Sequence, residues 1–128
     1  MSDDLRSRAE MINRYFIDAW NRGDIETACG VYAEDATYIG KGGIINGREN
    51  IVKHYRNQYP SVTVMGILAL KFVEFRCHSL ASPVMASGVL EFELLIPTDL
   101  YRGYTLEVYA MYGGELCIVQ DMSIGKST

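Results

Sequence analysis

The first third of the chain carries apolar residues at helical spacing. Between Asp3 and Asn21, side chains suited to one broad buried face recur every three or four positions, at Leu5, Met11, Ile12, Tyr15, Phe16, Ala19 and Trp20. Gly23 supplies a helix stop, and Asp24 can cap a second helix whose apolar positions are Ile25, Ala28, Cys29 and Tyr32. The pattern predicts a helical hairpin.

A third helix is predicted further along the chain. A short strand at Ala36–Ile39, the loop 40–43 and a short extended piece at 44–45 come first. After Gly47, apolar side chains recur at i, i+4 and i+8, which are Ile51, Tyr55 and Tyr59. Pro60 ends the helix.

The second half of the chain has the composition of strands. Four segments are rich in β-branched and aromatic residues: Val62–His78, Val84–Ile96, Tyr104–Tyr112 and Leu116–Ile124. Turns at 79–83, 97–103 and 113–114 separate them. We expect a meander of antiparallel strands, and helices followed by strands indicate the α+β class.

The stretch Val62–Leu70 is apolar on both alternating faces, whereas a strand with a solvated side has polar residues on that side. Something must therefore cover both faces. One interpretation is a homodimer formed through the sheet, and the other is that the chain itself covers the second face.

Composition narrows the class of protein. The 128 residues are 48% hydrophobic and 22% charged, which predicts one globular domain over residues 1–128. A net charge of -4 argues against nucleic acid as a partner. The polar N-terminus and the lack of a long apolar run predict no membrane association, and three cysteines in apolar surroundings suit a reducing, cytoplasmic location.

Several stretches together resemble the nuclear transport factor 2-like superfamily, which includes ketosteroid isomerases and SnoaL-like polyketide cyclases. They are Trp20–Asp24, Tyr32–Tyr38, Gly47–Ile51, Tyr55 and the last strand, Gly114–Ser123. The resemblance implies a cystatin-like α+β roll, with three N-terminal helices packed on a curved antiparallel sheet that forms a conical cavity. Such a cavity usually holds a small apolar or aromatic molecule.

The resemblance does not carry the ketosteroid isomerase residues with it. Alignment through the shared Asn-x-Gly-Asp turn puts the catalytic base position on Gly40 and the tyrosine position on Phe16. The aspartic acid position falls near Val108, and of the family's site only Tyr55 is kept. Many uncharacterised relatives end in a strand with a tryptophan and a histidine, where this chain has Leu116 and Met122. Steroid isomerisation by the usual residues is therefore not expected.

Asp121 is the acidic residue that we single out for acid/base chemistry, because it lies in a last strand suited to burial. In a regular strand, however, it would face away from Leu116, Ile118 and Met122 and be solvated. Both interpretations stay open. His54 and Tyr55, on the third helix, are further catalytic candidates, His54 as a base at a pocket rim or else as a partly exposed helix residue.

Three glutamates are better explained as surface residues. Glu91 and Glu93 alternate with Leu90, Phe92 and Leu94 as in an ordinary half-exposed strand, and Glu107 is expected in the same exposed rows.

Aromatic side chains supply material for a ligand cavity, although many of them could be plain core. The candidate ligand-binding residues are Phe16, Trp20, Tyr38, Tyr59, Phe72, Phe92, Tyr109 and Met122. Two histidines without a spaced Cys or Asp/Glu cluster indicate no metal, and no cofactor motif is present.

Two functions follow as hypotheses. The first is a small-molecule pocket protein, with possible activity as a cofactor-free lyase, isomerase or cyclase. The second is a non-catalytic dimeric module that binds a ligand or a partner protein.

Overall fold

A computed structural model describes residues 2–125. Four α-helices and one 3-10 helix accompany six strands: α1 Ser2–Asn21, α2 Ile25–Ala28, η1 Cys29–Val31, β1 Tyr32–Gly40, β2 Gly43–Asn46, α3 Arg48–Gln58, α4 Val62–Met65, β3 Ile67–Ser79, β4 Met85–Ile96, β5 Asp99–Tyr112 and β6 Glu115–Gly125. The predicted α+β class and the three N-terminal helices are confirmed. The second helix is shorter than expected, because Tyr32, assigned to it from the sequence, begins β1 four residues before the expected strand start at Ala36. Likewise β5 begins at Asp99, inside the turn predicted at 97–103.

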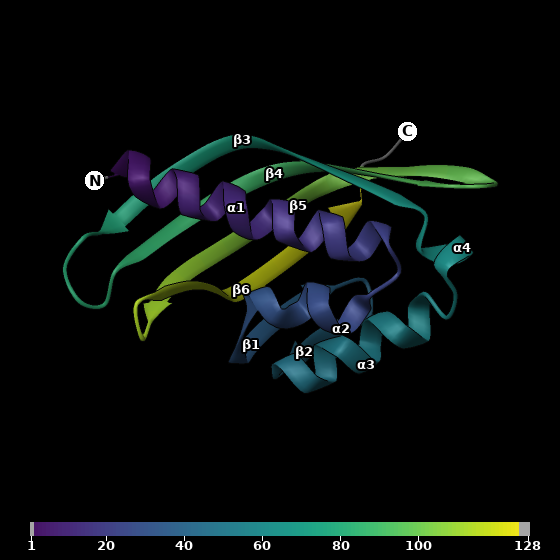
Figure 1. Ribbon diagram of the computed structural model, residues 1–128, viewed down its shortest axis with the longest axis horizontal. Helices are drawn as coiled ribbons and strands as arrows, with labels where there is room; N and C mark the ends of the chain where they lie inside the picture. Colours follow the sequence, from purple (N-terminus) through teal and green to yellow (C-terminus); the bar gives the residue numbers. More distant parts are fainter. Residues whose placement is uncertain (1, 126–128) are drawn as a thin grey trace.

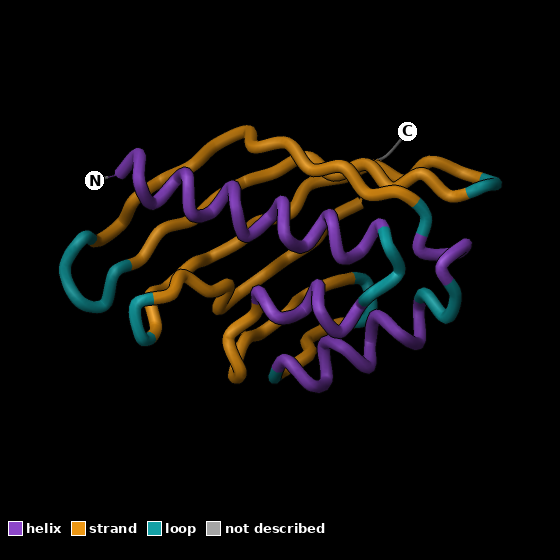
Figure 2. The backbone as a smooth tube through the Cα atoms, in the orientation of Figure 1, coloured by secondary structure: helices purple, strands orange, loops and turns teal. Residues whose placement is uncertain are grey.

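The six strands form one curved sheet in the order β2-β1-β6-β5-β4-β3. The long α1 helix lies along one face of this sheet, and α2 and α3 lie beside it over the end that holds β1 and β2 (Figure 1). Strands β3 to β6 form the expected antiparallel meander, with a wide loop between β3 and β4 and short turns in the other two connections (Figure 2). The sheet is not wholly antiparallel, because β1 pairs with β6 in parallel.

The end of α1 is held to α4 and to the start of β3 by two neighbouring side chains. The indole of Trp20 donates a hydrogen bond of 2.9 Å to the carbonyl oxygen of Met65. The amide of Asn21 donates to the carbonyl of Leu68 at 3.2 Å and accepts from its N–H at 2.8 Å. These contacts give the Trp-Asn pair a structural role, which is to set how far α1 stands from the sheet.

The apolar stretch that begins at Val62 is not one continuous strand. Residues 62–65 form α4, whose first turn is capped by Ser61, and Gly66 at φ 64° reverses the chain before β3 begins. A regular strand from residue 62 was the wrong expectation, because a serine cap and a glycine with positive φ favour a helical turn there. Of the β3 side chains, Leu68 and Leu70 face the helices while Ile67 stays 62% exposed on the other face.

An extra residue in β6 changes which side chains face the helices. Tyr109 of β5 pairs with Ile118, whereas the preceding β5 residue, Val108, pairs with Gln120, so Val119 is a bulge. Ile118 and Asp121 therefore face the same side although they are three positions apart.

No helix in the described part of the chain has the length and apolar character to span a membrane.

Candidate functional site

A pocket of about 120 Å³ lies between the helices and the concave face of the sheet. Aromatic and aliphatic side chains make most of its wall, with a polar group at the sheet side: the lining residues are Phe16, Trp20, Tyr32, Tyr38, Tyr55, Tyr59, Leu68, Leu70, Phe92, Leu94, Thr105, Glu107, Ile118, Asp121 and Ser123. We call this space the inner pocket. It combines apolar walls with a few convergent polar groups, as ligand sites do.

The helix-side wall is a cluster of rings. Phe16 stacks on Trp20 with 5.8 Å between ring centroids. Trp20 in turn meets Tyr55 and Tyr59 edge-on at 5.4 and 5.0 Å. These side chains come from α1 and α3, so the inner pocket exists only because the two helices pack against each other over the sheet.

Asp121 lies at the floor of the inner pocket and is only 5% exposed. The hydroxyl of Tyr32 donates to its Oδ2 at 2.5 Å, and the hydroxyl of Thr105 donates to its Oδ1 at 2.6 Å. Burial raises the pKa of Asp121, and the two hydrogen bonds partly offset that rise. The arrangement favours a carboxyl group that is more basic than a solvated one.

Glu107 is the second buried acid, at 4% exposure. Its Oε1 accepts hydrogen bonds from Asn13 Nδ2 at 2.9 Å and from the hydroxyl of Tyr109 at 2.5 Å. Both bonds fall on Oε1. Among the described residues no fully enclosed side-chain oxygen lacks a partner, so Oε2 is left accessible from the inner pocket that Glu107 lines.

The two acids face each other across neighbouring strands, since Glu107 and Asp121 are a register pair of β5 and β6. Burial, and then the charge of Asp121, raise the pKa of Glu107 to about 8. Two such carboxyl groups in one dry site cannot both ionise at little cost, so at neutral pH the pair holds one proton, mainly on Glu107. The pocket thus presents a base and an acid side by side.

The tyrosines around the pair remain protonated. Burial raises the pKa of Tyr32 well above its ordinary value, and the nearby Asp121 charge adds to this effect. Burial likewise raises the pKa of Tyr55, whose hydroxyl lies 3.4 Å from that of Tyr32. A row of hydroxyl groups therefore runs from Tyr55 through Tyr32 to Asp121, and each can donate a hydrogen bond.

The structure resolves the open question about Asp121 and corrects the expectation for Glu107. The Val119 bulge turns Asp121 to the helix side, and Glu107, expected on the surface, faces inward with its neighbours Thr105 and Tyr109. Alternation along β5 is regular, so the error for Glu107 came from assigning it to the exposed rows by its charge alone. Glu91 and Glu93 are exposed, as expected.

Besides Asp121, six predicted positions line the inner pocket: Phe16, Trp20, Tyr38, Tyr55, Tyr59 and Phe92. Met122 does not, because the Val119 bulge places its two neighbours inward and Met122 on the opposite face. Phe72 lies too far along β3 and packs against Phe75.

Two further candidates stand next to the inner pocket without lining it. Tyr109 lies behind the lining, fully buried, where it donates to Glu107. His54 is 5.6 Å from the ring of Tyr38, outside the inner pocket, in agreement with a rim position.

Four residues of the polar group escaped the sequence analysis: Asn13, Tyr32, Thr105 and Ser123. The inward parity of β5 could have found Thr105, since it shares a face with Tyr109. Nothing in the helical pattern marks Asn13, a polar residue on the buried side of α1 that also donates to the carbonyl of Ala9.

The described residues contain no group of three or more metal-ligating side chains.

Two positions that the sequence analysis aligned with isomerase residues, Gly40 and Phe16, lie near the pocket tyrosines. At Gly40 a β-carbon would stand 2.8 Å from the ring of Tyr38, so that ring fills the space beside the backbone there. Phe16 offers no hydroxyl, but its ring meets Tyr32 edge-on at 6.5 Å, and Tyr32 supplies a hydroxyl at the pocket floor instead.

Solved structures share this architecture. A protein from Shewanella oneidensis, described as NTF-2-like and of unknown function, matches with a TM-score of 0.83 at 22% identity, over 93% of this chain and 98% of that one. The fold is nuclear transport factor 2-like. A domain of unknown function with a cystatin-like fold from Nostoc punctiforme matches with a TM-score of 0.79 at 23% identity, over 100% of this chain and 80% of that one.

The nuclear transport factor 2-like resemblance drawn from the sequence is confirmed. The SnoaL-like domain model matches residues 13–74, which carry most of the helices and the first strands. A ketosteroid isomerase-like protein from Erwinia carotovora atroseptica matches with a TM-score of 0.76 at 14% identity, over 95% of this chain and 96% of that one. No curated protein matches the sequence. At these identities the solved structures establish the fold and leave the chemistry to the site itself.

Proposed function

We propose that this nuclear transport factor 2-like protein binds a small carbonyl compound in the inner pocket and catalyses proton transfer within it without a cofactor. The observation that carries the proposal is the buried register pair of acids, Glu107 and Asp121, on the floor of an aromatic pocket, where burial raises the pKa of both. Pairs of titratable groups whose environments separate their protonation states are a common basis of acid/base catalysis.

The proposed step is an enolisation. The Asp121 carboxylate takes a proton from the carbon next to the carbonyl, and the electron pair of that C–H bond moves to the carbonyl oxygen. The proton on Glu107 Oε2 forms a hydrogen bond to that oxygen and stabilises the negative charge that develops there. When the substrate has a β,γ carbon–carbon double bond, the enolate is a dienolate. Return of the proton from Asp121 to its γ carbon then completes an isomerisation, and both acids end as they began.

The position of the hydroxyl groups supports this division of roles. Tyr32 and Thr105 each donate to one oxygen of Asp121, and a carboxylate still has lone pairs left to accept a proton. Tyr109 and Asn13 hold Glu107 by Oε1 alone, which leaves Oε2 for the ligand. Tyr55 stands one hydroxyl further out, as a donor toward the ligand or Tyr32.

Exchange of hydrogen for deuterium tests the proposal. Cyclohex-2-enone in D₂O is followed by proton NMR with and without the protein. We expect the protein to accelerate exchange at the carbon that loses the proton, and Asp121→Asn to lower that rate by about 100-fold or more. Asp35→Asn, at an exposed acid of β1, is the matched control. Exchange at the buffer rate with the native protein would contradict the proposal.

A homodimer formed through the sheet is the assembly that we propose. The face of the sheet away from the helices carries a band of exposed apolar side chains from four strands: Ile67, Leu95, Tyr104, Leu106 and Ile124. Exposed apolar patches of this kind mark association surfaces. The Arg102–Glu93 ion pair and the register partners Lys71 and Glu91 lie among these residues, so a second copy related by a twofold axis meets both charge signs within the band.

A further inference from the structure

The inner pocket opens into a second space that is much larger. This outer chamber has a volume of about 660 Å³, against about 120 Å³ for the inner pocket. Five residues line both spaces and therefore form the throat between them: Tyr38, Tyr59, Phe92, Leu94 and Ser123. A ligand that reaches the two acids can extend through this throat.

The inner pocket limits the part of the ligand that enters it. An engineered protein cavity of about 150 Å³ takes up benzene, so a space of this order holds about one six-membered ring. The rings of Phe16 and Trp20 close its helix side and are stacked on each other. A fused ring system would have to displace them.

The outer chamber has a different chemical character. Its lining includes the polar side chains of Lys41, His54, Gln58, Asp99 and Tyr101. One lysine and one aspartate offset each other's charge. Partial burial lowers the pKa of His54, so the imidazole is neutral near neutral pH and can both donate and accept a hydrogen bond. Arg102 also borders the chamber, but it is paired with Glu93 at 3.4 Å.

We infer that the ligand is a two-part molecule: a carbonyl head of a single six-membered ring in the inner pocket, joined to a neutral, hydrogen-bonding tail that lies in the outer chamber. This inference rests on the proposed function for the chemistry of the head. It adds the size of the head, the existence of a tail and the neutral polar character of that tail.

Binding of four phenols by calorimetry tests the inference, since a phenol resembles the enol form of a cyclic ketone. The probes are phenol, 4-propylphenol, 4-(3-hydroxypropyl)phenol and 2-naphthol. We expect phenol to bind and 2-naphthol to bind at least about tenfold more weakly, because overfilling a packed site costs more than 1 kcal/mol. The hydroxypropyl compound should bind more tightly than phenol.

Gln58 and a matched control identify the site of the tail. Gln58→Leu should weaken the binding of 4-(3-hydroxypropyl)phenol by about fivefold, the equivalent of one hydrogen bond. It should leave the affinities for phenol and 4-propylphenol unchanged. Gln120→Leu, at an exposed glutamine of β6, should change none of them. Both glutamines are exposed, so neither substitution is expected to unfold the protein.

The outcomes separate the two proposals. If phenol binds but the hydroxypropyl tail adds no affinity, or Gln58→Leu has no effect on it, the two-part ligand is wrong while the acid pair stands. If 2-naphthol binds as well as phenol, the single-ring head is wrong. If phenol itself does not bind, the proposed function and this inference both fail.

Discussion

At the residue scale, the pocket depends on two carboxyl groups kept in different states by their surroundings. Asp121 has a hydroxyl on each oxygen, whereas Glu107 has both of its donors on one. Hydrogen bonds to the charged form favour ionisation, and burial opposes it. The difference in donors therefore decides which acid keeps the proton, and Tyr32 is central to it.

The stability of the protein should depend on the proton of Glu107. Its pKa is raised to about 8 from an ordinary 4.5, so the folded chain holds a proton that the unfolded chain releases between these values. Stability is then full below pH 4.5 and declines as the pH rises toward 8. We expect a melting temperature about 10 °C lower at pH 8 than at pH 5.5, and a smaller difference in Glu107→Gln.

Glu91→Gln is the control for that experiment, because Glu91 is an exposed acid on the neighbouring strand. It should keep the full pH dependence of the native protein. A Glu107→Gln variant whose melting temperature falls as steeply as that of the native chain would show that Glu107 ionises normally.

Tyr32 should contribute to stability through Asp121. Tyr32→Phe removes one of the two donors to a buried carboxylate, which costs about 1–3 kcal/mol of unfolding free energy, measured by urea denaturation at pH 7. Tyr15→Phe, at a tyrosine 52% exposed on α1, should change the free energy of unfolding little. Equal stabilities of the two variants would mean that the hydrogen bond to Asp121 contributes nothing.

At the element scale, the shape of the pocket is set where strands bend or lack a side chain. A β-carbon on Gly103 of β5 would lie 2.1 Å from the carbonyl oxygen of Ile124 and 2.6 Å from the ring of Phe92. Phe92 lines both the inner pocket and the throat. The glycine therefore makes room for a ring that separates the two spaces.

Gly103→Ala should destabilise the protein by about 2–3 kcal/mol in urea denaturation, since the added methyl group meets backbone and a packed ring. Gly30→Ala is the matched control, because a β-carbon there meets nothing within 4 Å. If Gly103→Ala were as stable as Gly30→Ala, the close approach of β5 to Phe92 would be refuted.

The periodicity of the chain was enough to predict the elements but not every facing direction. Helical spacing identified α1 and α3, and the turn residues separated the strands, because these signals are local. Asp121 depended on the bulge at Val119, which forms through pairing with β5 and has no glycine to mark it. The burial of Glu107 could not be predicted either, because a charged residue on a strand is buried only when other side chains supply donors. Here Asn13, from a distant part of the chain, and Tyr109 supply them.

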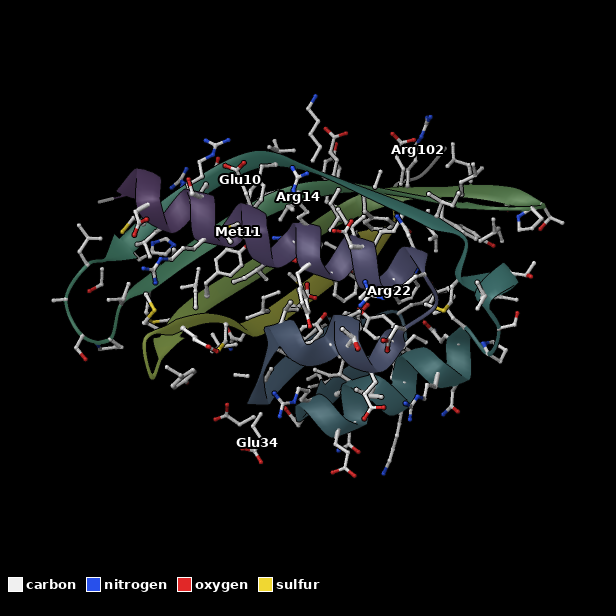
Figure 3. All side chains as sticks on the ribbon, viewed as in Figure 1. Glu10, Met11, Arg14, Arg22, Glu34 and Arg102 are labelled. Atoms are coloured by element: carbon white, nitrogen blue, oxygen red, sulfur yellow. The ribbon has the colours of Figure 1, made fainter. Side chains whose placement is uncertain are left out.

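The α1 helix has apolar residues on its exposed side and a polar residue on its buried side. Met11 and Tyr15 widened the apolar stripe in the sequence, yet both are exposed, and Figure 3 shows Met11 beside Glu10 and Arg14 on the outward side of the helix. Asn13 is buried instead, at 4% exposure. Tertiary partners, and not hydrophobicity alone, decided which face of α1 meets the sheet.

At the scale of the whole molecule, the two faces of the sheet have separate uses. The concave face carries the acids under the helices, and the opposite face carries the exposed apolar band. A dimer formed through that band leaves the throat open, because the sheet residues of the throat, Phe92, Leu94 and Ser123, lie on the helix side of their strands. Association and ligand binding should therefore be separable by mutation.

Light scattering at micromolar concentration tests the assembly. The native protein should give a mass near twice 14.4 kDa, and Leu106→Lys, in the centre of the band, should give 14.4 kDa without loss of phenol binding. Ile44→Lys, at a residue 68% exposed on β2, should stay dimeric. A native protein found only at 14.4 kDa would rule the sheet dimer out.

The central claim, one proton shared unequally by two facing acids, is tested most directly by a carbon-13 NMR titration of the side-chain carboxyl groups. The account predicts that Glu107 titrates with a pKa of about 8 and that Asp121 titrates above its ordinary value of 3.8, with each resonance also sensing the other's ionisation. Two independent titrations, both at the values of solvated carboxyl groups, would contradict it.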